Sequence, residues 1–260
     1  MATAIGIGIA GDVFQTEAGI GAPAPAATCP TTYSCLYDGI TEHQTNATSP
    51  VLGAGGTGNF TITFWIKTPD TTGANGAPAG VNQRIISNLG SGGSNFWSLY
   101  LTAAGKFQWV SDAIGNDGYG TFTPANDTWY HIAFSVDRSG NQSWYANAGS
   151  ANTQASTGAT AFTGTDTFYI GRTGGGQYFQ GNLTEVAIWD KALSQAEIAD
   201  LYALSSRCYG DESFGSNLQH WWRMFNPTGV YAATMPDAAG SFDITNTNMG
   251  AGNVSTDVPT

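Results

Sequence analysis

The sequence predicts an all-β protein: a two-sheet antiparallel sandwich with one short helix and an extended N-terminal arm. Short segments of alternating apolar and polar residues recur along the chain, separated by clusters of Gly, Asn, Asp and Pro. One stretch carries the start signals of a helix. Charged residues make up only 10% of the chain, and 35 of its 260 residues are Gly, which indicates a turn-rich surface of low charge.

The N-terminal residues 1–28 are small, mixed in polarity and end in a Pro-Ala run. They cannot bury enough surface to fold alone, so they are predicted to form an extended arm, and residues 29–260 to form the sandwich with its closing strands. The first residues, "MATAIGIGIAG", have no basic region and no long apolar run. We therefore expect no secretory signal.

The predicted strands show the two-residue period of a sheet. In the segment 60–67, Phe and Ile alternate with Thr, Trp and Lys, so one side faces the core and the other faces outward. Outer faces rich in Thr, Ser and Gln are expected. Similar alternation occurs at residues 96–102, 106–112, 129–137, 142–148, 167–173 and 183–190.

The predicted helix covers residues 193–204, "LSQAEIADLYAL". Ser194 is the expected N-cap, and Glu197 completes a capping box. Leu193 and Ile198 supply the hydrophobic staple. After this helix, "LQHWWRMFNPTG" is predicted to return to the sandwich as a late strand, with one of Trp221 and Trp222 in the core and the other covering an outer surface.

Several motifs occur in the order found in laminin G-like, concanavalin A-like domains. They are "YSCLYDGITEH", "FTITFWIKT", "WYHIAFSVDRSGNQSWYANA", "FYIGR" and "YFQGNLTEVAIWDKALSQAEIADLY". The chain resembles that family over about residues 33–205, which implies a jelly-roll sandwich. The closing segments "LQHWWRMFNPTG" and "MPDAAGSFDITNTNM" resemble the end of laminin G-like virion proteins of tailed bacteriophages.

Charge narrows the choice of partners. The net charge is −11 with eight Lys and Arg, so nucleic acid is a poor partner, and no apolar run reaches the ~18 residues of a membrane span.

We expect a non-enzymatic structural virion protein of a tailed phage (capsid decoration, fibre or tail-associated subunit). Assembled in the host cytoplasm, it would meet other virion subunits through its arm, as a homo-oligomer or in a lattice. The alternative is a glycan-binding adhesin that contacts host polysaccharide.

We expect no catalytic site. The Glu-x-Asp-x-x-Glu strand of the related glucanases does not occur, and the resemblance assigns Glu185 a structural use. His131 matches a position where the family commonly has a histidine on a sheet face, and we expect a hydrogen-bonded structural side chain there. His220 beside Trp221 stays open, since a zinc site would need further ligands.

Binding residues are predicted where aromatic rings lie near hydrogen-bonding side chains, because a sugar stacks its CH face on a ring. The candidates are Trp97, Trp109, Asn116, Asp117, Tyr119 and Trp144. The family often holds calcium, and the loop "SDAIGNDGYG" offers oxygen ligands at Asp112, Asn116 and Asp117, although ordinary turn chemistry explains it as well.

The three cysteines, Cys29, Cys35 and Cys208, cannot all pair within one chain. Reduced thiols are expected, with a Cys29–Cys35 bridge or a bridge to Cys208 as alternatives.

Overall fold

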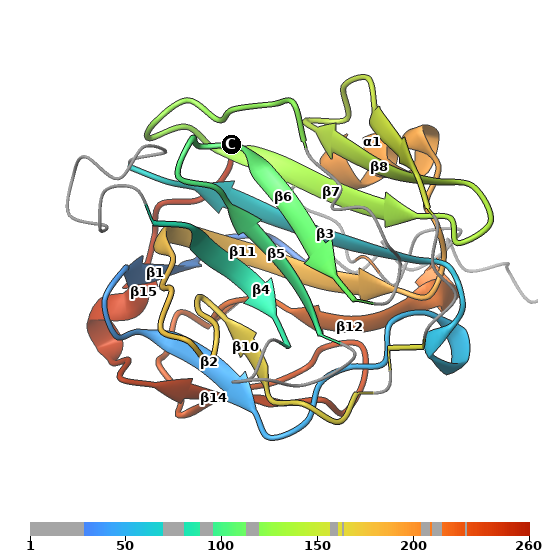
Figure 1. Cartoon of the computed structure of the whole chain (residues 1–260). Coiled ribbons are helices and arrows are strands. Elements are labelled where there is room, and N and C mark those ends of the chain that lie inside the picture. The colour runs from blue at the N-terminus through green and yellow to red at the C-terminus, as the bar shows by residue number, and fades with distance from the viewer. Residues whose placement is uncertain are drawn as a thin grey trace, which may run out of the picture.

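A computed structural model describes residues 29–69, 81–88, 96–112, 120–156, 161–162, 164–203, 209, 215–226 and 228–260. Their strands form two antiparallel sheets that pack face to face (Figure 1). The predicted all-β jelly-roll sandwich is confirmed. The predicted arm, residues 1–28, lies outside the described residues.

The first sheet has eight strands in the order β15-β1-β11-β3-β7-β8-β9, with β12 paired to β11. The central strands are the predicted apolar segments, and β11 and β3 form its middle. The strands are β1 (Ser34–Asp38), β3 (Phe60–Lys67), β7 (Tyr130–Val136), β8 (Asn141–Ala146), β9 (Asn152–Ala155), β11 (Gln180–Trp189), β12 (Leu218–Trp222) and β15 (Val254–Ser255).

The second sheet has seven strands in the order β13-β14-β2-β10-β4-β5-β6. Because β1 and β2 are consecutive but lie in different sheets, the chain crosses between the layers from its first strand connection onward. The strands are β2 (His43–Asn46), β4 (Gln83–Ser87), β5 (Trp97–Leu101), β6 (Phe107–Ser111), β10 (Phe168–Ile170), β13 (Thr234–Met235) and β14 (Ile244–Thr247). Short 3-10 turns lie at Ala54–Gly56, Gly215–Asn217 and Ala251–Asn253.

The main core fills the space between the sheets and is rich in aromatic rings. Trp109 illustrates its packing: its ring centroid lies 4.8 Å from that of Phe134 and 5.7 Å from that of Phe60. The inward residues of the segment 60–67 are all fully buried, as their alternation predicts. The aromatic contacts bury large apolar areas and contribute most of the stabilisation between the layers.

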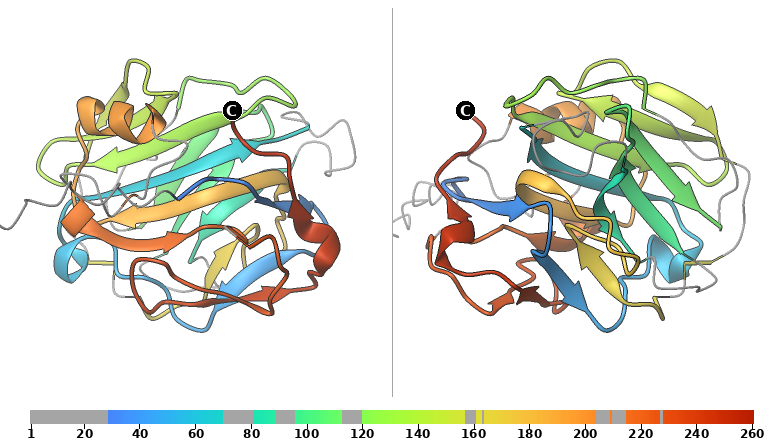
Figure 2. Two further views of the ribbon diagram at one scale, coloured as in Figure 1. Left: turned by 180° about the vertical axis from the view of Figure 1, so that it is seen from behind. Right: turned by 60° about the vertical axis from the view of Figure 1, so that its left-hand side comes forward.

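The outer face of the first sheet is also covered, contrary to the expectation of an open polar face. Helix α1 (Gln195–Ala203) lies against this face, as the view from the back of the molecule shows (Figure 2, left). Beneath it, a second hydrophobic cluster includes Trp189, Leu193, Ile198 and Trp221. The outward threonines of β3 are buried under this cover, and hydrogen bonds satisfy their hydroxyl groups: the Thr63 hydroxyl, for example, accepts from Trp189 Nε1 at 3.2 Å.

Strand β12 separates its two tryptophans as predicted. Trp222 is fully buried in the main core, where its ring centroid lies 5.3 Å from that of Phe168. Trp221 faces the other way, into the second cluster, and stacks on Tyr209 at 5.0 Å. The adjacent rings therefore belong to two hydrophobic clusters on opposite faces of one strand.

The helix cap is confirmed. The Ser194 hydroxyl accepts the Glu197 backbone N–H at 3.4 Å, the Ser194 backbone N–H donates to Glu197 Oε2 at 2.9 Å, and Leu193 and Ile198 are both buried. In the part of the chain that the structure describes, no helix is long and apolar enough to cross a membrane.

Candidate functional site

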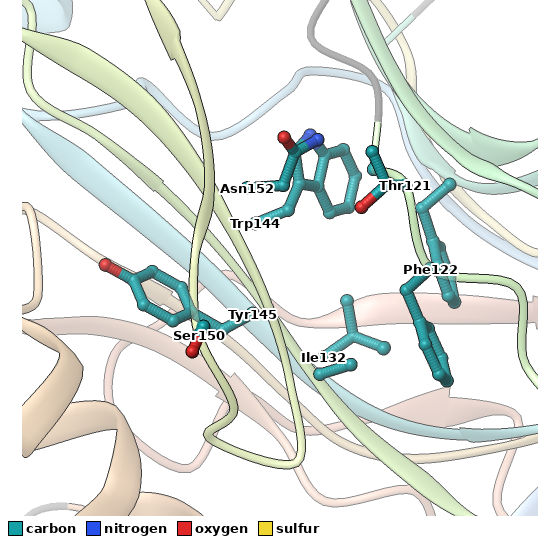
Figure 3. A pocket seen from close by; sticks show the side chains of 10 residues that line it. Thr121, Phe122, Ile132, Trp144, Tyr145, Ser150 and Asn152 are labelled. Atoms are coloured by element: carbon teal, nitrogen blue, oxygen red, sulfur yellow. The ribbon is translucent and has the colours of Figure 1, made fainter.

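A cavity opens between the two sheets at the side where β6 ends the second sheet and β8 and β9 end the first. We call it the Trp144 cavity (Figure 3). Its volume is about 170 Å³. It is lined by Phe107, Gly120, Thr121, Phe122, Ile132, Trp144, Tyr145, Ala146, Ser150 and Asn152.

Aromatic packing fixes the walls of the cavity. The Trp144 ring centroid lies 4.6 Å from that of Phe134, which holds the indole from the core side. Phe122 stacks on Phe107 at 6.4 Å and meets Tyr130 edge-on at 4.8 Å. Rings held on several sides lose little entropy when a ligand binds, so these walls are preformed.

Gly120 permits the close approach of the two walls. Its backbone N–H donates to the Phe107 carbonyl at 2.8 Å. A Cβ at this position would lie 3.3 Å from Phe107 Cβ and 3.7 Å from Trp144 Cδ2, so a larger side chain would enter the cavity wall. A side chain at this position would therefore require Phe107 to shift by a few tenths of an ångström.

Polar groups surround the apolar walls. Thr121 and Ser150 are exposed and Asn152 is half-buried. In Figure 3, Thr121 and Phe122 face Trp144 across the cavity and Asn152 lies beside the indole, whereas the Tyr145 ring points away. Trp144 is only 6% exposed, and its Nε1–H has no hydrogen-bond partner among the described residues. A buried donor without a partner is costly.

The structure separates the predicted binding residues. Trp97 and Trp109 are fully buried and stack on each other at 5.6 Å in the main core, so the expected ligand role of these two rings is wrong. Both alternate inward from the second sheet, and a core ring offers no free face to a sugar. Trp144 does line a cavity. The other predicted binding residues, Asn116, Asp117 and Tyr119, lie outside the described residues.

Of the predicted calcium ligands, the structure describes only Asp112. This residue follows β6, is exposed, and donates its backbone N–H to the Phe96 carbonyl at 3.3 Å. Within the described ranges, no three or more His, Cys, Asp or Glu side chains gather closely enough to hold a metal ion. Calcium at Asp112, Asn116 and Asp117 stays a prediction.

Glu185 forms the centre of a buried polar network. A β-bulge interrupts the pairing of β11 with β3 between Thr184 and Ala187, and Glu185 within it has φ 50. The bulge turns the carboxylate toward β12, where Trp221 Nε1 donates to Oε2 at 2.6 Å and Arg223 Nη2 lies 3.2 Å from Oε1. The Thr31 hydroxyl donates to Oε1 at 2.9 Å.

This network explains why Glu185 is not suited to acid–base chemistry. Burial raises the pKa of its carboxyl above the usual range, while Arg223 and the hydrogen bonds from Thr31 and Trp221 oppose that rise. Both carboxylate oxygens already accept hydrogen bonds from the protein, so neither is directed at a ligand. The structural use that the sequence resemblance gave Glu185 agrees with these contacts.

Arg223 extends the network to the chain that enters the sandwich. Its Nη2 also donates to the carbonyls of Cys29 and Pro30 at 3.0 and 3.2 Å, and its guanidinium lies 4.7 Å from the Trp221 ring centroid. Asn226 Oδ1 accepts the backbone N–H groups of Thr32 and Tyr33 at 2.7 and 2.8 Å. The segment that follows the predicted arm is therefore fixed to the first sheet.

The histidines differ from expectation. His131 is fully buried, but neither ring nitrogen has a hydrogen-bond partner among the described residues, so the predicted hydrogen-bonded side chain is wrong. Its neighbours are aromatic: the Trp65 ring lies 5.2 Å away and the Tyr202 ring 6.2 Å away. Burial lowers the pKa of His131 from 6.5 to about 3. His220 Nδ1 lies 2.7 Å from Asp237 Oδ2 and has a structural partner.

The cysteines also differ from expectation. Cys29 is disulfide-bonded and Cys35 is free and buried, which overturns the prediction of three reduced thiols and excludes a Cys29–Cys35 bridge. Cys208, the remaining cysteine, lies outside the described residues.

Sequence reasoning missed most of the cavity. Phe122 is in a Gly- and Pro-rich connection, and Ser150 and Asn152 are in a small polar segment that leads into β9. The available signal was the alternation along β8, which places Trp144 on the inner face near the edge of the sheet. Its partners come from another sheet, and no local pattern identifies them.

Comparison with known proteins agrees with this architecture. Residues 41–199 match the family model described as concanavalin A-like lectin/glucanases superfamily. A protein from Bacteroides ovatus described as carbohydrate-binding has a similar structure, with a TM-score of 0.61 and 18% identity over 87% of this chain; the match spans 59% of that protein. A heptameric SAP-like pentraxin from Limulus polyphemus gives a TM-score of 0.50 and 16% identity, over 82% of this chain and 94% of the pentraxin. No curated protein sequence matches significantly.

Proposed function

Since this chain belongs to the concanavalin A-like lectin/glucanases superfamily, we propose that it is a non-enzymatic glycan-binding module whose binding site is the Trp144 cavity. The observation that carries the proposal is the Trp144 indole: it lines a cavity between polar side chains, and its Nε1–H is buried without a partner among the described residues. A sugar hydroxyl oxygen is an acceptor of suitable size.

The cavity fits one sugar ring. Its volume of about 170 Å³ is smaller than the ~300 Å³ of a pocket that encloses a drug-sized ligand. Trp144 and Phe122 offer apolar surface for the CH groups of the ring. Thr121, Ser150 and Asn152 at the rim supply hydroxyl and amide groups for the sugar hydroxyls. A terminal or side-branch residue of a polysaccharide matches this arrangement.

A glycan array probed with and without calcium tests the proposal, because the predicted ligands Asp112, Asn116 and Asp117 make calcium dependence a separate question. We expect binding to at least one neutral glycan class. Loss of that binding with EDTA would support the calcium prediction. No binding above background in either condition would reject the glycan-binding function.

Variants locate the site. Trp144→Phe keeps an aromatic ring and removes the N–H donor, so we expect three- to tenfold weaker binding, corresponding to about 1 kcal/mol for one hydrogen bond. Asn152→Ala should weaken binding as well. Asn141→Ala is the matched control, because Asn141 is exposed on β8 and does not line the cavity. If all three variants bind the glycan as tightly as the unchanged chain does, the ligand binds elsewhere.

A second candidate function is that of a structural virion subunit of a tailed phage: a capsid decoration, fibre or tail-associated protein. The observation that favours it is the fixed segment 29–33, which Glu185, Arg223 and Asn226 hold against the first sheet. An arm that crosses to a neighbouring subunit needs such a fixed junction with its own sandwich. The two functions are compatible, since a subunit on a particle surface can also bind polysaccharide.

Light scattering of the purified chain tests this second function. We expect the full chain to form a homo-oligomer, and a chain without residues 1–28 to be a monomer with an intact sandwich by circular dichroism. A monomeric full chain at high concentration would contradict a role of the arm between copies. Detection of the protein in purified particles would establish the virion location.

A further inference from the structure

Two arginines lie on the outer face of the second sheet without an acidic partner among the described residues. Arg84 is on β4, directly opposite Tyr100 of β5, and Arg172 follows β10. We call this region the two-arginine face. It consists of His43, Arg84, Tyr100, Tyr169, Arg172, Gln177 and Tyr178.

Arg84 is held rigidly. Its guanidinium carbon lies 3.9 Å from the Tyr100 ring centroid, and its Nε donates to Gln177 Oε1 at 2.8 Å. The residue is 8% exposed, and its Nη1 is buried without a hydrogen-bond partner in the described part of the chain. A buried guanidinium nitrogen without an acceptor is unfavourable, and an anionic group would stabilise it.

Arg172 is held by a second set of rings. Its guanidinium carbon lies 5.2 Å from the Tyr169 ring centroid and 5.1 Å from that of Tyr178. Its Nε and Nη2 donate to the carbonyls of Thr173 and Gly174 at 2.9 and 3.4 Å. Because these acceptors are neutral, they do not compensate the positive charge.

Two adjacent residues contact the two arginines. Arg84 binds Gln177, and Arg172 lies over Tyr178, the next residue. Gln177 and Tyr178 also line a cavity of about 240 Å³ with Val81, which is partly exposed at 36%, and Ile40, which is exposed at 62%. The residues that contact the two arginines therefore also line a hollow with apolar and aromatic surface.

Three other cations have carboxylate partners. Lys67 pairs with Asp257 at 2.6 Å, Arg223 pairs with Glu185, and Lys191 pairs with Glu197. In a chain of net charge −11, these two arginines form a local positive region without carboxylate partners among the described residues. The arrangement indicates a ligand that brings its own negative charge.

We propose that the two-arginine face binds the carboxylate or sulfate group of an acidic saccharide. The planar guanidinium groups bind such anions through paired hydrogen bonds, and Tyr169 and Tyr178 offer ring faces to the sugar. This proposal rests on the glycan-binding function, and it names an acidic glycan class and a site separate from the Trp144 cavity.

Binding of the full chain to immobilised polysaccharides tests the proposal. The probes are polygalacturonate for a carboxylate, dextran sulfate for a sulfate and neutral dextran as the uncharged polymer. We expect the chain to bind at least one acidic polymer and to bind it more weakly as salt rises. Which acidic polymer binds decides between carboxylate and sulfate. Neutral dextran that binds Trp144→Phe as tightly as the acidic polymers do, or no binding to either acidic polymer, would overturn the proposal.

Variants locate this site independently. Arg172→Gln and Arg84→Gln should each weaken acidic-polymer binding at least tenfold, and Arg172→Lys should restore it only in part, since Lys lacks the planar fork. Lys191→Gln is the control, because it removes the same charge at a position away from this face, where Lys191 pairs with Glu197. Unchanged binding in folded Arg172→Gln would overturn the proposal, whatever the result for Arg84→Gln.

Two further measurements separate this proposal from its alternatives. Poly-glutamate tests an acidic peptide: if it binds as tightly as the acidic polysaccharides and loses binding in Arg172→Gln, the saccharide assignment is wrong. Trp144→Phe tests independence from the first site: it should weaken neutral-glycan binding and leave acidic-polymer binding unchanged. Loss of both activities in Trp144→Phe would mean that one site accounts for both ligands.

Discussion

The Glu185 carboxylate and the Arg223 guanidinium form a buried ion pair with an O–N distance of 3.2 Å, and both also bind the segment that enters the sandwich. Their side chains are 3% and 11% exposed. The pair thus joins β11, the residue after β12 and residues 29–31, which are more than 150 positions away from Glu185 in the sequence.

We predict that Glu185→Gln lowers the free energy of unfolding by about 3 to 5 kcal/mol, because it leaves the Arg223 charge buried without a partner. Urea unfolding measures this loss. Lys67→Met is the control: it breaks the more exposed pair with Asp257 and should cost less than about 1 kcal/mol. A similar small cost for both variants would contradict a structural role of the buried pair. Glycan binding by folded Glu185→Gln should be unchanged.

His131 makes stability depend on pH. Its folded-state pKa of about 3 lies below the ordinary value of 6.5, so only the unfolded chain takes up a proton between these values. The contribution is fully present above pH 6.5 and is lost as pH falls toward 3, by about 1.4 kcal/mol per pH unit. His131→Phe should remove this slope. The measurement is the difference in unfolding free energy between the two proteins from pH 7 to pH 4, and parallel curves would disprove the assignment.

Gly181 on β11 is predicted to tolerate no side chain. It has φ 134, and a Cβ there would lie 2.2 Å from the Lys67 carbonyl oxygen. Gly181→Ala should therefore cost about 2 to 4 kcal/mol, from backbone strain and a clash with β3. Gly175→Ala is the control, since no atom lies within 4 Å of a Cβ at that position. Thermal unfolding of the two variants compares them directly, and equal midpoints would argue against the close approach of β11 to β3 at this glycine.

The cysteines give a prediction that a thiol count checks. In denaturant without a reductant, we expect one reactive thiol per chain, Cys35, and three after reduction, because Cys208 is the only partner left for Cys29. In the folded protein Cys35 should not react, since burial raises its pKa to about 12. Cys29→Ser should lower stability by about 2 to 5 kcal/mol. Three thiols in denaturant without a reductant would show that no bridge forms.

The local pattern of apolar and polar residues determined the strands and the capped helix. It also determined that Trp221 and Trp222 lie on opposite faces of one strand. These features follow from local geometry: side chains alternate along a strand, and a cap needs only residues three positions apart. The alternation at 60–67 similarly identified the inner face of β3. It could not show that the outer face is buried too, because the residues that cover it come from α1 and β12, far along the chain.

Tertiary structure decided which residues form a site. Trp97, Trp109 and Trp144 all alternate inward, yet of these three only Trp144 lines the cavity, because it lies near the open side of the sandwich, where Thr121, Phe122 and Asn152 meet it. Glu185 gained its hydrogen-bond partners, and His131 its aromatic surroundings, through contacts between distant segments. Periodicity fixes the direction of a side chain, whereas burial, partners and pKa depend on which strands the fold places next to it.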